Sequence, residues 1–168
     1  MNESSPYLKK TGIRRYILLL SFCCMNLYAD PKSMTLEVYK TPSCGCCVGW
    51  IGHIEEHGFR TNVYHPDEIG ALKLKKGIKR QFQSCHTGVS AEGYVFEGHI
   101  PARFIKEFLD SPPANSIGLS VPGMPVGSPG MEVGDKFLPY QILTLMRDGT
   151  TRVFKEIRTM SEQHTPSG

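Results

Sequence analysis

The sequence lacks an apolar run long enough to cross a membrane as a helix. Its most apolar stretch, residues 16–28, is interrupted by Ser21 and Asn26. At roughly 1.5 Å per residue this stretch would extend about 20 Å, short of the ~30 Å hydrocarbon core of a bilayer. Four basic residues precede it: Lys9, Lys10, Arg14 and Arg15. A basic segment followed by a short apolar run is typical of a secretory signal peptide.

The expected end of this signal peptide lies at Leu27-Tyr28-Ala29, where small Ala29 stands directly before the predicted cut. We therefore predict that residues 1–29 form a signal peptide, that cleavage precedes Asp30, and that the protein is exported. An uncleaved leader that tethers the chain to the membrane is the alternative. Export bears on the chemistry, because extracytoplasmic compartments oxidise free thiols.

The sequence also lacks an excess of charge of either sign outside the leader. The whole chain has 19 Lys and Arg against 16 Asp and Glu, but the leader holds four of the basic residues and one acid, which leaves 15 of each sign. Balanced charge gives no support for nucleic-acid binding or for attraction to an anionic membrane. About 139 residues remain after the predicted cut, enough for one domain with one core.

Cysteine is scarce but concentrated. Two of the six cysteines lie in the leader, and three of the remaining four stand together in Cys44-Gly45-Cys46-Cys47. Because an exported protein normally has its thiols oxidised, a thiol cluster there needs a chemical purpose. The sequence therefore indicates a redox site or a soft-metal site.

Hydrophobic periodicity predicts an α/β fold. Residues 34–40 alternate apolar and polar side chains, as in a half-buried strand, and residues 48–57 have the apolar spacing of an amphipathic helix. Further along the chain we predict a strand at 59–64, a helix at 68–76, a hairpin of strands 87–90 and 94–97, a helix at 101–109, a loop over 111–139, and a hairpin of strands 141–146 and 151–157.

These elements predict a thioredoxin-like architecture, with a central mixed β-sheet flanked by helices. The predicted domain spans residues 30–158, and a loop rich in proline, glycine and methionine precedes its last hairpin. This loop, over residues 111–139, holds six prolines and five glycines. The polar tail at 159–168 is predicted to be disordered.

Cys44 and Cys47 form a CxxC pattern at the junction between the predicted first strand and first helix, as in thioredoxin-like proteins. A helix N-terminus stabilises thiolates, which makes them better nucleophiles or metal ligands. Thiol–disulfide exchange needs one attacking and one resolving sulfur, so the additional Cys46 favours metal binding, because adjacent thiolates repel one another unless they hold a cation. A structural disulfide from Cys44 or Cys46 to Cys85 is the alternative for this cluster.

Candidate ligands outside the cluster follow from the predicted sheet. Cys85 and His86 directly precede the third predicted strand, which a thioredoxin-like sheet would bring near the start of the first helix, and they offer a sulfur and an imidazole to one ion. His99 ends the next strand and is a ligand or a partner of the following helix. His53 lies two turns into the first helix, where packing is the better interpretation.

Two methionines, Met124 and Met131, each follow a Pro-Gly pair and lie seven residues apart in the proline-rich loop. A loop stiffened by proline can hold a thioether at a fixed point, and thioethers are soft donors that suit Cu(I) far better than Zn(II). We therefore predict both as copper ligands. Apolar plugs that cover the cysteines are the alternative.

With these motifs in order, the chain resembles the CopG-like exported copper-resistance proteins, a thioredoxin-like bacterial family formerly known only as a domain of unknown function. The resemblance runs from about Leu36 to Phe154. It includes residues 41–47, Trp50 with His53, and residues 84–87, 93–102, 122–125 and 127–132.

The resemblance implies a periplasmic protein that binds copper through a cysteine-rich cluster. Cycling of the bound copper between Cu(I) and Cu(II) is a further activity that the resemblance implies. The implied metal ligands are Cys44, Cys46, Cys47 and Cys85, completed by His86, His99, Met124 and Met131. Expected partners are copper ions and other periplasmic copper-handling proteins. Gly88 departs from the alanine that the family often has.

Two other functions stay open at this point. A thiol–disulfide oxidoreductase would use Cys44 as nucleophile and Cys47 as resolving thiol, although thioredoxin-type enzymes have a proline where Ser84-Cys85-His86 stands here. Four cysteines could also hold a structural zinc ion or an iron–sulfur cluster. Because adjacent side chains at a helix start diverge by ~100°, Cys46 and Cys47 suit several bridged ions better than one tetrahedral ion. We therefore predict a metal-binding protein that sequesters more than one Cu(I) ion, and whether it is also a copper oxidoreductase stays open.

Overall fold

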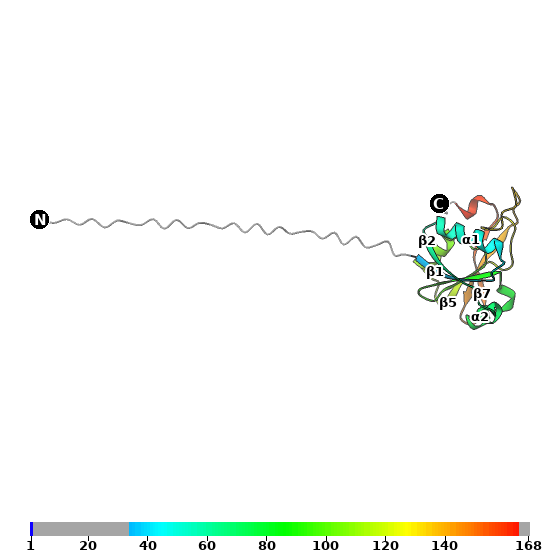
Figure 1. The fold of residues 1–168 in the computed structure, drawn as a ribbon, viewed down its shortest axis with the longest axis horizontal. Helices are drawn as coiled ribbons and strands as arrows, with labels where there is room; N and C mark the ends of the chain where they lie inside the picture. The colour runs from blue at the N-terminus through cyan, green and yellow to red at the C-terminus, as the bar shows by residue number, and fades with distance from the viewer. Residues whose placement is uncertain (2–33, 165–168) are drawn as a thin grey trace. The chain divides into compact units, whose positions relative to one another are not determined.

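The computed structural model describes Met1 and residues 34–164 (Figure 1). The chain divides into two units, residues 1–30 and 31–168, and the fold below is that of the second. The predicted signal peptide and its cleavage site lie outside the described residues. Within the described residues, no helix combines the length and the apolar character needed to cross a bilayer.

Seven strands form one mixed sheet in the order β2-β1-β3-β4-β5-β6-β7. The strands are β1 Met34–Lys40, β2 Phe59–Tyr64, β3 His86–Ser90, β4 Val95–Glu97, β5 Ser116–Ser120, β6 Tyr140–Met146 and β7 Thr151–Ile157. The β1/β2 and β4/β5 pairs are parallel, and the other four pairs are antiparallel. The sheet order β2-β1-β3-β4 is the thioredoxin-like part that the sequence predicts.

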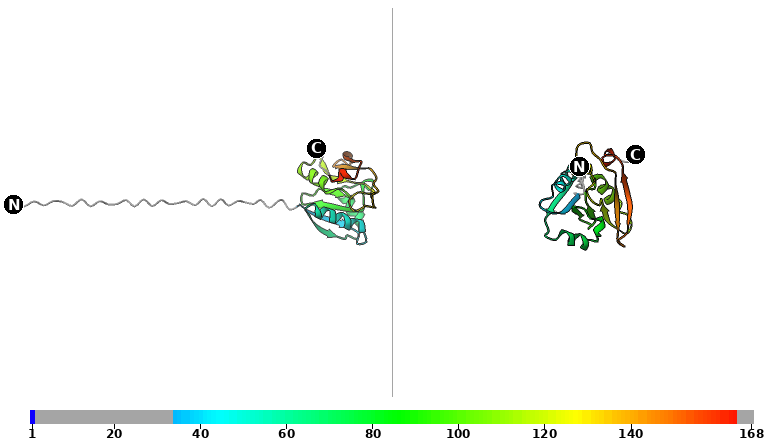
Figure 2. Two further views of the ribbon diagram at one scale, coloured as in Figure 1. Left: turned by 90° about the horizontal axis from the view of Figure 1, so that it is seen from above. Right: turned by 90° about the vertical axis from the view of Figure 1, so that its right-hand side faces the viewer.

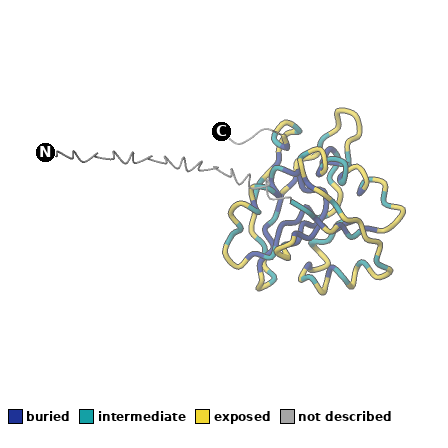
Figure 3. Tube along the Cα trace, turned by 60° about the vertical axis from the view of Figure 1, so that its left-hand side comes forward, coloured by how far each residue is buried: buried dark blue, intermediate teal, exposed yellow. Residues whose placement is uncertain are grey.

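Helices cover both faces of this sheet (Figures 1 and 2). They are α1 Gly45–Glu56, α2 Ile69–Lys75 and α3 Ala102–Asp110, with short 3₁₀ turns η1 Arg80–Phe82 and η2 Ser161–Gln163. The larger core packs Trp50 of α1 and Phe104 of α3 against Phe96 of the sheet, and a smaller core on the other face contains Ile78, which follows α2, and Val89. Figure 3 shows the buried residues gathered in the central strands.

The alternating pattern of β1 explains its place in the sheet. Leu36 and Val38 are fully buried in the larger core, while Glu37 between them is exposed. Gly88 lies opposite Val38 in the β1/β3 ladder, and an added Cβ there would lie 3.3 Å from the Trp50 ring. A methyl group at residue 88 would therefore contact the indole tightly, and the ring would have to shift by a few tenths of an ångström.

The prediction of a loop over residues 111–139 is wrong at Ser116–Ser120, which form β5 between β4 and β6. Prolines flank this segment and a glycine lies at its centre. Because both residue types are uncommon within strands, the sequence pattern indicated a loop. Gly118 has φ of 150°, and a Cβ there would lie 1.8 Å from the Val95 carbonyl oxygen. Glycine is thus required by the close approach of β4, and the strand is formed by pairing on both sides rather than by local propensity.

The structure also departs from the predicted disordered tail over residues 159–164, which include η2. Gln163 is buried, accepts a hydrogen bond of 2.7 Å from the Tyr140 hydroxyl, and donates one of 2.8 Å to the Gly127 carbonyl. A polar side chain ties this segment to the domain, which apolar patterning could not reveal. Residues 165–168 of the predicted tail lie outside the described residues.

Replacing Gly118 by alanine tests the close approach of β4. Because the added methyl would overlap the Val95 backbone, we expect Gly118→Ala to lower the free energy of unfolding by roughly 3 kcal/mol or more, measured by urea denaturation. Gly70→Ala is the control, since nothing lies within 4 Å of a Cβ at Gly70 in α2 and alanine favours helix by about 0.5–1 kcal/mol. Equal stabilities for the two variants would contradict the tight packing of β5.

Candidate metal centre

The register between β1 and β3 brings the two cysteine-bearing segments together. Lys40, the last residue of β1, lies opposite His86, the first residue of β3. The chain continues from Lys40 into Cys44 and α1, while Cys85 directly precedes His86. Both segments therefore meet at the same edge of the sheet.

Lys40 also shapes the turn that leads to α1. Its side chain is buried, and its ammonium group donates hydrogen bonds to the carbonyls of Thr41 at 2.9 Å and Pro42 at 3.3 Å. Cys44 is the N-cap of α1, with an extended backbone and no side-chain cap. The helix begins at Gly45, three residues before the start that the apolar spacing predicts, so Cys46 and Cys47 lie in its first turn.

The four cysteines form one compact group, which we call the cysteine cluster: Cys44, Cys46, Cys47 and Cys85. Their sulfur atoms all lie within 4.8 Å of one another. Cys44 and Cys47 are joined as a disulfide, whereas Cys46 and Cys85 are free thiols. The Sγ atom of Cys46 lies 3.5 Å from that of Cys44 and 3.8 Å from that of Cys85.

The alternative of a disulfide from Cys44 or Cys46 to Cys85 is therefore wrong in this structure, which has the bond within the CxxC pair. Cys44 is half-buried and Cys47 is fully buried, so the bond has one sulfur near the surface. As it stands the cluster offers two thiols, and two-electron reduction of the disulfide would make all four sulfurs available as ligands.

Cys85 belongs to a second group of potential ligands, which we call the Cys–His group: Cys85, His86 and His99. The Cys85 Sγ lies 3.0 Å from His99 Nε2 and 3.4 Å from His86 Nδ1. The other ring nitrogen of His99, Nδ1, lies 2.8 Å from the Pro129 carbonyl oxygen. Since a carbonyl only accepts, Nδ1 carries the proton and Nε2 faces Cys85 with its lone pair.

His86 is fully buried between two rings. Its ring centroid lies 4.2 Å from that of Trp50 and 4.9 Å from that of His99. Its Nε2 atom has no hydrogen-bond partner among the described residues, which is unusual for a buried polar atom. The nitrogen that faces Cys85 is the other one, Nδ1, at 3.4 Å, so His86 offers an imidazole nitrogen to an ion beside the cysteine.

Burial sets the charge of these groups. It raises the pKa of Cys85 to about 11, with the neighbouring Cys46 adding to the effect. Burial lowers the pKa of His86 well below its usual value, and it lowers that of His99 as well. Without a metal ion, the Cys–His group at neutral pH thus holds a protonated thiol and neutral imidazoles, and a metal would have to displace the thiol proton.

His53 is in neither of the two donor groups of the described residues and bonds to the start of α3, in agreement with the packing interpretation. Its Nε2 accepts a 3.0 Å hydrogen bond from the backbone N–H of Ala102, which starts α3. Burial, with His57 and His164 nearby, lowers the pKa of His53 to about 4. The neutral ring therefore serves as an acceptor for the helix.

The proline–glycine loop, residues 121–131, touches the site at two points. A Cβ on Gly130 would come within 2.5 Å of the Cys46 carbonyl oxygen and the Trp50 nitrogen, so this glycine packs directly on α1. At the other point the Ser84 hydroxyl donates a hydrogen bond to the Gly123 carbonyl. Met131 and Met124 follow these two glycines, and Met131 is half-buried whereas Met124 is 54% exposed.

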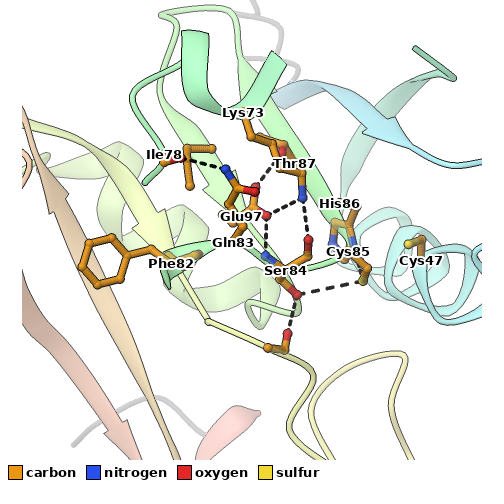
Figure 4. A network of polar contacts seen from close by, with 12 residues as sticks. Cys47, Lys73, Ile78, Phe82, Gln83, Ser84, Cys85, His86, Thr87 and Glu97 are labelled. Carbon is orange, nitrogen blue, oxygen red and sulfur yellow. Dashed lines mark hydrogen bonds and ion pairs between the residues drawn. The ribbon is translucent and has the colours of Figure 1, made fainter. Parts of the chain in front are cut away.

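Sequence reasoning missed a buried ion pair behind Cys85. Lys73 of α2 and Glu97 of β4 are both buried, and their charged groups lie 2.5 Å apart (Figure 4). The sequence gives one sign of this ion pair, which is the charged Glu97 at the end of a strand whose other residues are apolar. The sequence alone does not indicate that Glu97 pairs with Lys73, because Lys73 lies on a helix whose lysines are expected to face solvent.

The chain is similar to a protein family and to solved structures whose matches include the residues of this site. A family model described as a protein of unknown function, DUF411, matches residues 82–131, a span that contains the Cys–His group and the proline–glycine loop. No curated protein sequence matches the chain. Two solved structures are similar, both titled copper resistance protein CopG.

Form 2 of that protein is 39% identical, with a TM-score of 0.71, and the match covers 76% of this chain and 100% of the other. Form 1 is 40% identical with a TM-score of 0.70, covering 75% of this chain and 98% of the other. Both matches extend over all or nearly all of the solved chains, so the similarity includes the whole fold and is not confined to the site.

The raised pKa of Cys85 predicts slow alkylation at neutral pH. The rate of reaction with iodoacetamide, followed by mass spectrometry of the Cys85 peptide, should rise with pH to a midpoint near 11. In Cys46→Ser the midpoint should fall but stay above the ordinary value of 9.0, because burial remains when the neighbouring thiol is removed. A wild-type midpoint at or below 9.0 would contradict the buried, protonated thiol.

Proposed function

The chain belongs to the CopG-like family of copper-resistance proteins, and from this premise we propose that it sequesters Cu(I) on the thiolates of its cysteine cluster. Sequestration would lower the free copper concentration, which is the simplest route from copper binding to resistance. The proposal includes His86 and His99 as further ligands.

The observation that carries the proposal is the convergence of four sulfur atoms within 4.8 Å of one another at a helix N-terminus. Thiolates are soft donors, which select Cu(I) over hard cations such as magnesium or calcium. Zinc also accepts four thiolates, but it prefers one tetrahedral set. Here Cys85 also groups with His86 and His99, so the two groups together offer more donors than one tetrahedral ion takes.

More than one ion fits this arrangement better than a single ion. Cys85 lies in both donor groups, the cysteine cluster and the Cys–His group. A thiolate can bridge two metal ions, so Cys85 could join one ion held by sulfur to another held partly by His86 and His99. The imidazoles would help the second ion tolerate the Cu(II) state, which supports cycling between Cu(I) and Cu(II) as a further part of the proposal.

The position of the proline–glycine loop supports the proposal that this loop covers the bound ions. Gly130 packs on α1 beside Cys46, and Pro129 holds His99 by its carbonyl. Met131 follows Gly130 directly and is half-buried, and Met124 is 54% exposed at the outer end of the same loop. We therefore include both thioethers as soft ligands that limit access of water to copper.

The location of this function is proposed to be the periplasm. Residues 1–29 have the pattern of a signal peptide, and copper-resistance proteins of this kind would act on copper before it enters the cytoplasm. Copper ions are the proposed cargo, and other periplasmic copper-handling proteins are the proposed partners for delivery or removal.

One observation favours a second function, thiol–disulfide exchange. Cys44 and Cys47 are bonded as a CxxC disulfide at the start of α1, with Cys44 half-buried. A thioredoxin-type enzyme would use this pair alone. Against this function, the segment facing the pair presents Cys85 and His86, two further ligand-type side chains that exchange would not require.

Anaerobic titration with Cu(I) against a chromophoric chelator separates the two functions. We expect reduced protein to bind Cu(I) tightly and Cys46→Ser to weaken binding by about 100-fold or more, because removal of a direct ligand should exceed the 10–100-fold cost of removing an outer-shell partner. The titration of protein with the Cys44–Cys47 disulfide intact should show weaker binding, since two sulfurs are withheld.

Val48→Ser is the control, since it places a serine two residues after Cys46 in α1, at a side chain that is 60% exposed and carries no sulfur, and it should leave this binding intact. An insulin-reduction assay on the same samples measures exchange. Full reductase activity that survives Cys46→Ser, or tight binding of one zinc ion in preference to copper, would reject the copper proposal.

The methionine lid gives a separate prediction. Met124→Leu/Met131→Leu keeps the apolar volume but removes both thioethers, so Cu(I) affinity should fall by about tenfold. Met160→Leu makes the same change outside the loop and should have no effect on affinity. Unchanged affinity in the double variant would assign the methionines to covering the site rather than to binding the metal.

A further inference from the structure

The segment that carries Cys85 has no regular secondary structure of its own. Residues 83–85 connect η1 to β3, and Cys85 must nevertheless keep its sulfur in contact with both Cys46 and His99. Something other than the sheet ladder has to fix the backbone just before β3.

That support comes from a pair of buried charges. Lys73 is 2% exposed and Glu97 is 0% exposed, with Lys73 Nζ 2.5 Å from Glu97 Oε1. Both reach Ser84, the residue before Cys85. The Ser84 N–H donates to Glu97 Oε1 at 2.6 Å, and the Ser84 carbonyl accepts from Lys73 Nζ at 2.6 Å.

The same carboxylate reaches past Cys85 on the other side. The Thr87 hydroxyl donates to Glu97 Oε2 at 2.5 Å, so Glu97 binds the residues before and after the Cys85–His86 pair. Gly98 follows Glu97, and a Cβ there would lie 2.7 Å from Ser84 Cβ. In Figure 4 these hydrogen bonds form one connected network that extends from Lys73 through Ser84 to Cys85.

A buried ion pair is a poor choice if stability is its sole purpose. Removing two charges from water is costly, and well-packed apolar side chains of similar volume often serve folding as well or better. What apolar side chains cannot do is satisfy both backbone groups of one residue. The pair at Ser84 does so with one donor and one acceptor.

We propose that Lys73 and Glu97 are positioning residues for the metal centre, which clamp the Ser84 peptide groups and thereby hold the Cys85 sulfur against Cys46 and His99. This role rests on the proposed copper function, because its purpose is to preorganise a ligand. Lys73 and Glu97 do not touch the metal themselves. They act as outer partners that fix a ligand in place, a role known to affect metal affinity.

A metal-free experiment measures the positioning directly. In a chain with Cys23, Cys24, Cys44 and Cys47 replaced by serine, Cys46 and Cys85 are the remaining thiols. These two thiols react with one molecule of oxidised glutathione to give the Cys46–Cys85 disulfide and two molecules of reduced glutathione. The equilibrium constant reports the effective concentration of one thiol at the other.

We expect Lys73→Met to lower this effective concentration by about tenfold or more, because the Ser84 carbonyl loses its donor. Lys73→Met/Glu97→Gln, which leaves no unpaired buried charge, should show the same loss and serves if the single variant folds poorly. Ser120→Ala is the matched control. It removes another buried hydrogen bond, from Ser120 to the Phe82 carbonyl at 2.6 Å, two residues before Ser84, and leaves both hydrogen bonds to the Ser84 backbone in place.

A merely structural pair would lower stability in the Lys73 and Ser120 variants alike and leave the effective concentration unchanged in both. That result, or a background chain in which Cys46 and Cys85 do not form the disulfide, would overturn the proposal. Each variant is therefore also followed by thermal unfolding.

The second measurement is Cu(I) affinity in the otherwise native chain. Lys73→Met should weaken it by about 10–100-fold, the range for loss of an outer partner, whereas Ser120→Ala should not. Lower effective concentration with unchanged Cu(I) affinity would reject a role of the clamp in metal binding. If the unaltered protein does not bind copper but Lys73→Met still lowers the effective concentration, the copper function is rejected. The positioning of Cys85 by Lys73 and Glu97 is then retained.

Discussion

The antiparallel pairing of β1 with β3 is the constraint on which the site depends. It sets Lys40 opposite His86, so that Cys46 and Cys85, 39 residues apart in the sequence, bring their sulfur atoms to 3.8 Å. A slip of one residue would turn every side chain of the moved strand to the other face of the sheet. Because β1 buries Leu36 in the core, the hydrophobic core and the metal centre are fixed by the same register.

Burial at this point of the fold sets the chemistry of the site. It keeps Cys85 protonated, with a pKa raised to about 11, and it lowers the pKa of His86. A neutral centre can be packed beside Trp50 without unpaired charge, and the thiol becomes anionic when a cation replaces its proton. The buried charges are placed behind the site instead, where Lys73 and Glu97 neutralise each other.

The sequence predicted those parts of the molecule that local pattern determines. Alternation at residues 34–40 identified β1, and three cysteines at a strand-to-helix junction identified the cluster. It missed β5, because Gly118 is required by contact with Val95 and not by the local sequence. It missed the Cys44–Cys47 bond as the pairing and the clamp at Ser84, since both depend on which distant groups the folded sheet brings together.

The central claim, that the cysteine cluster holds more than one Cu(I) ion, is tested most directly by X-ray absorption spectroscopy at the copper edge on reduced, Cu(I)-loaded protein. The account predicts an edge typical of Cu(I), a first shell dominated by sulfur, and a copper–copper scattering path that disappears in Cys46→Ser. A first shell of nitrogen or oxygen alone, or sulfur ligation with no copper–copper path at full loading, would contradict it.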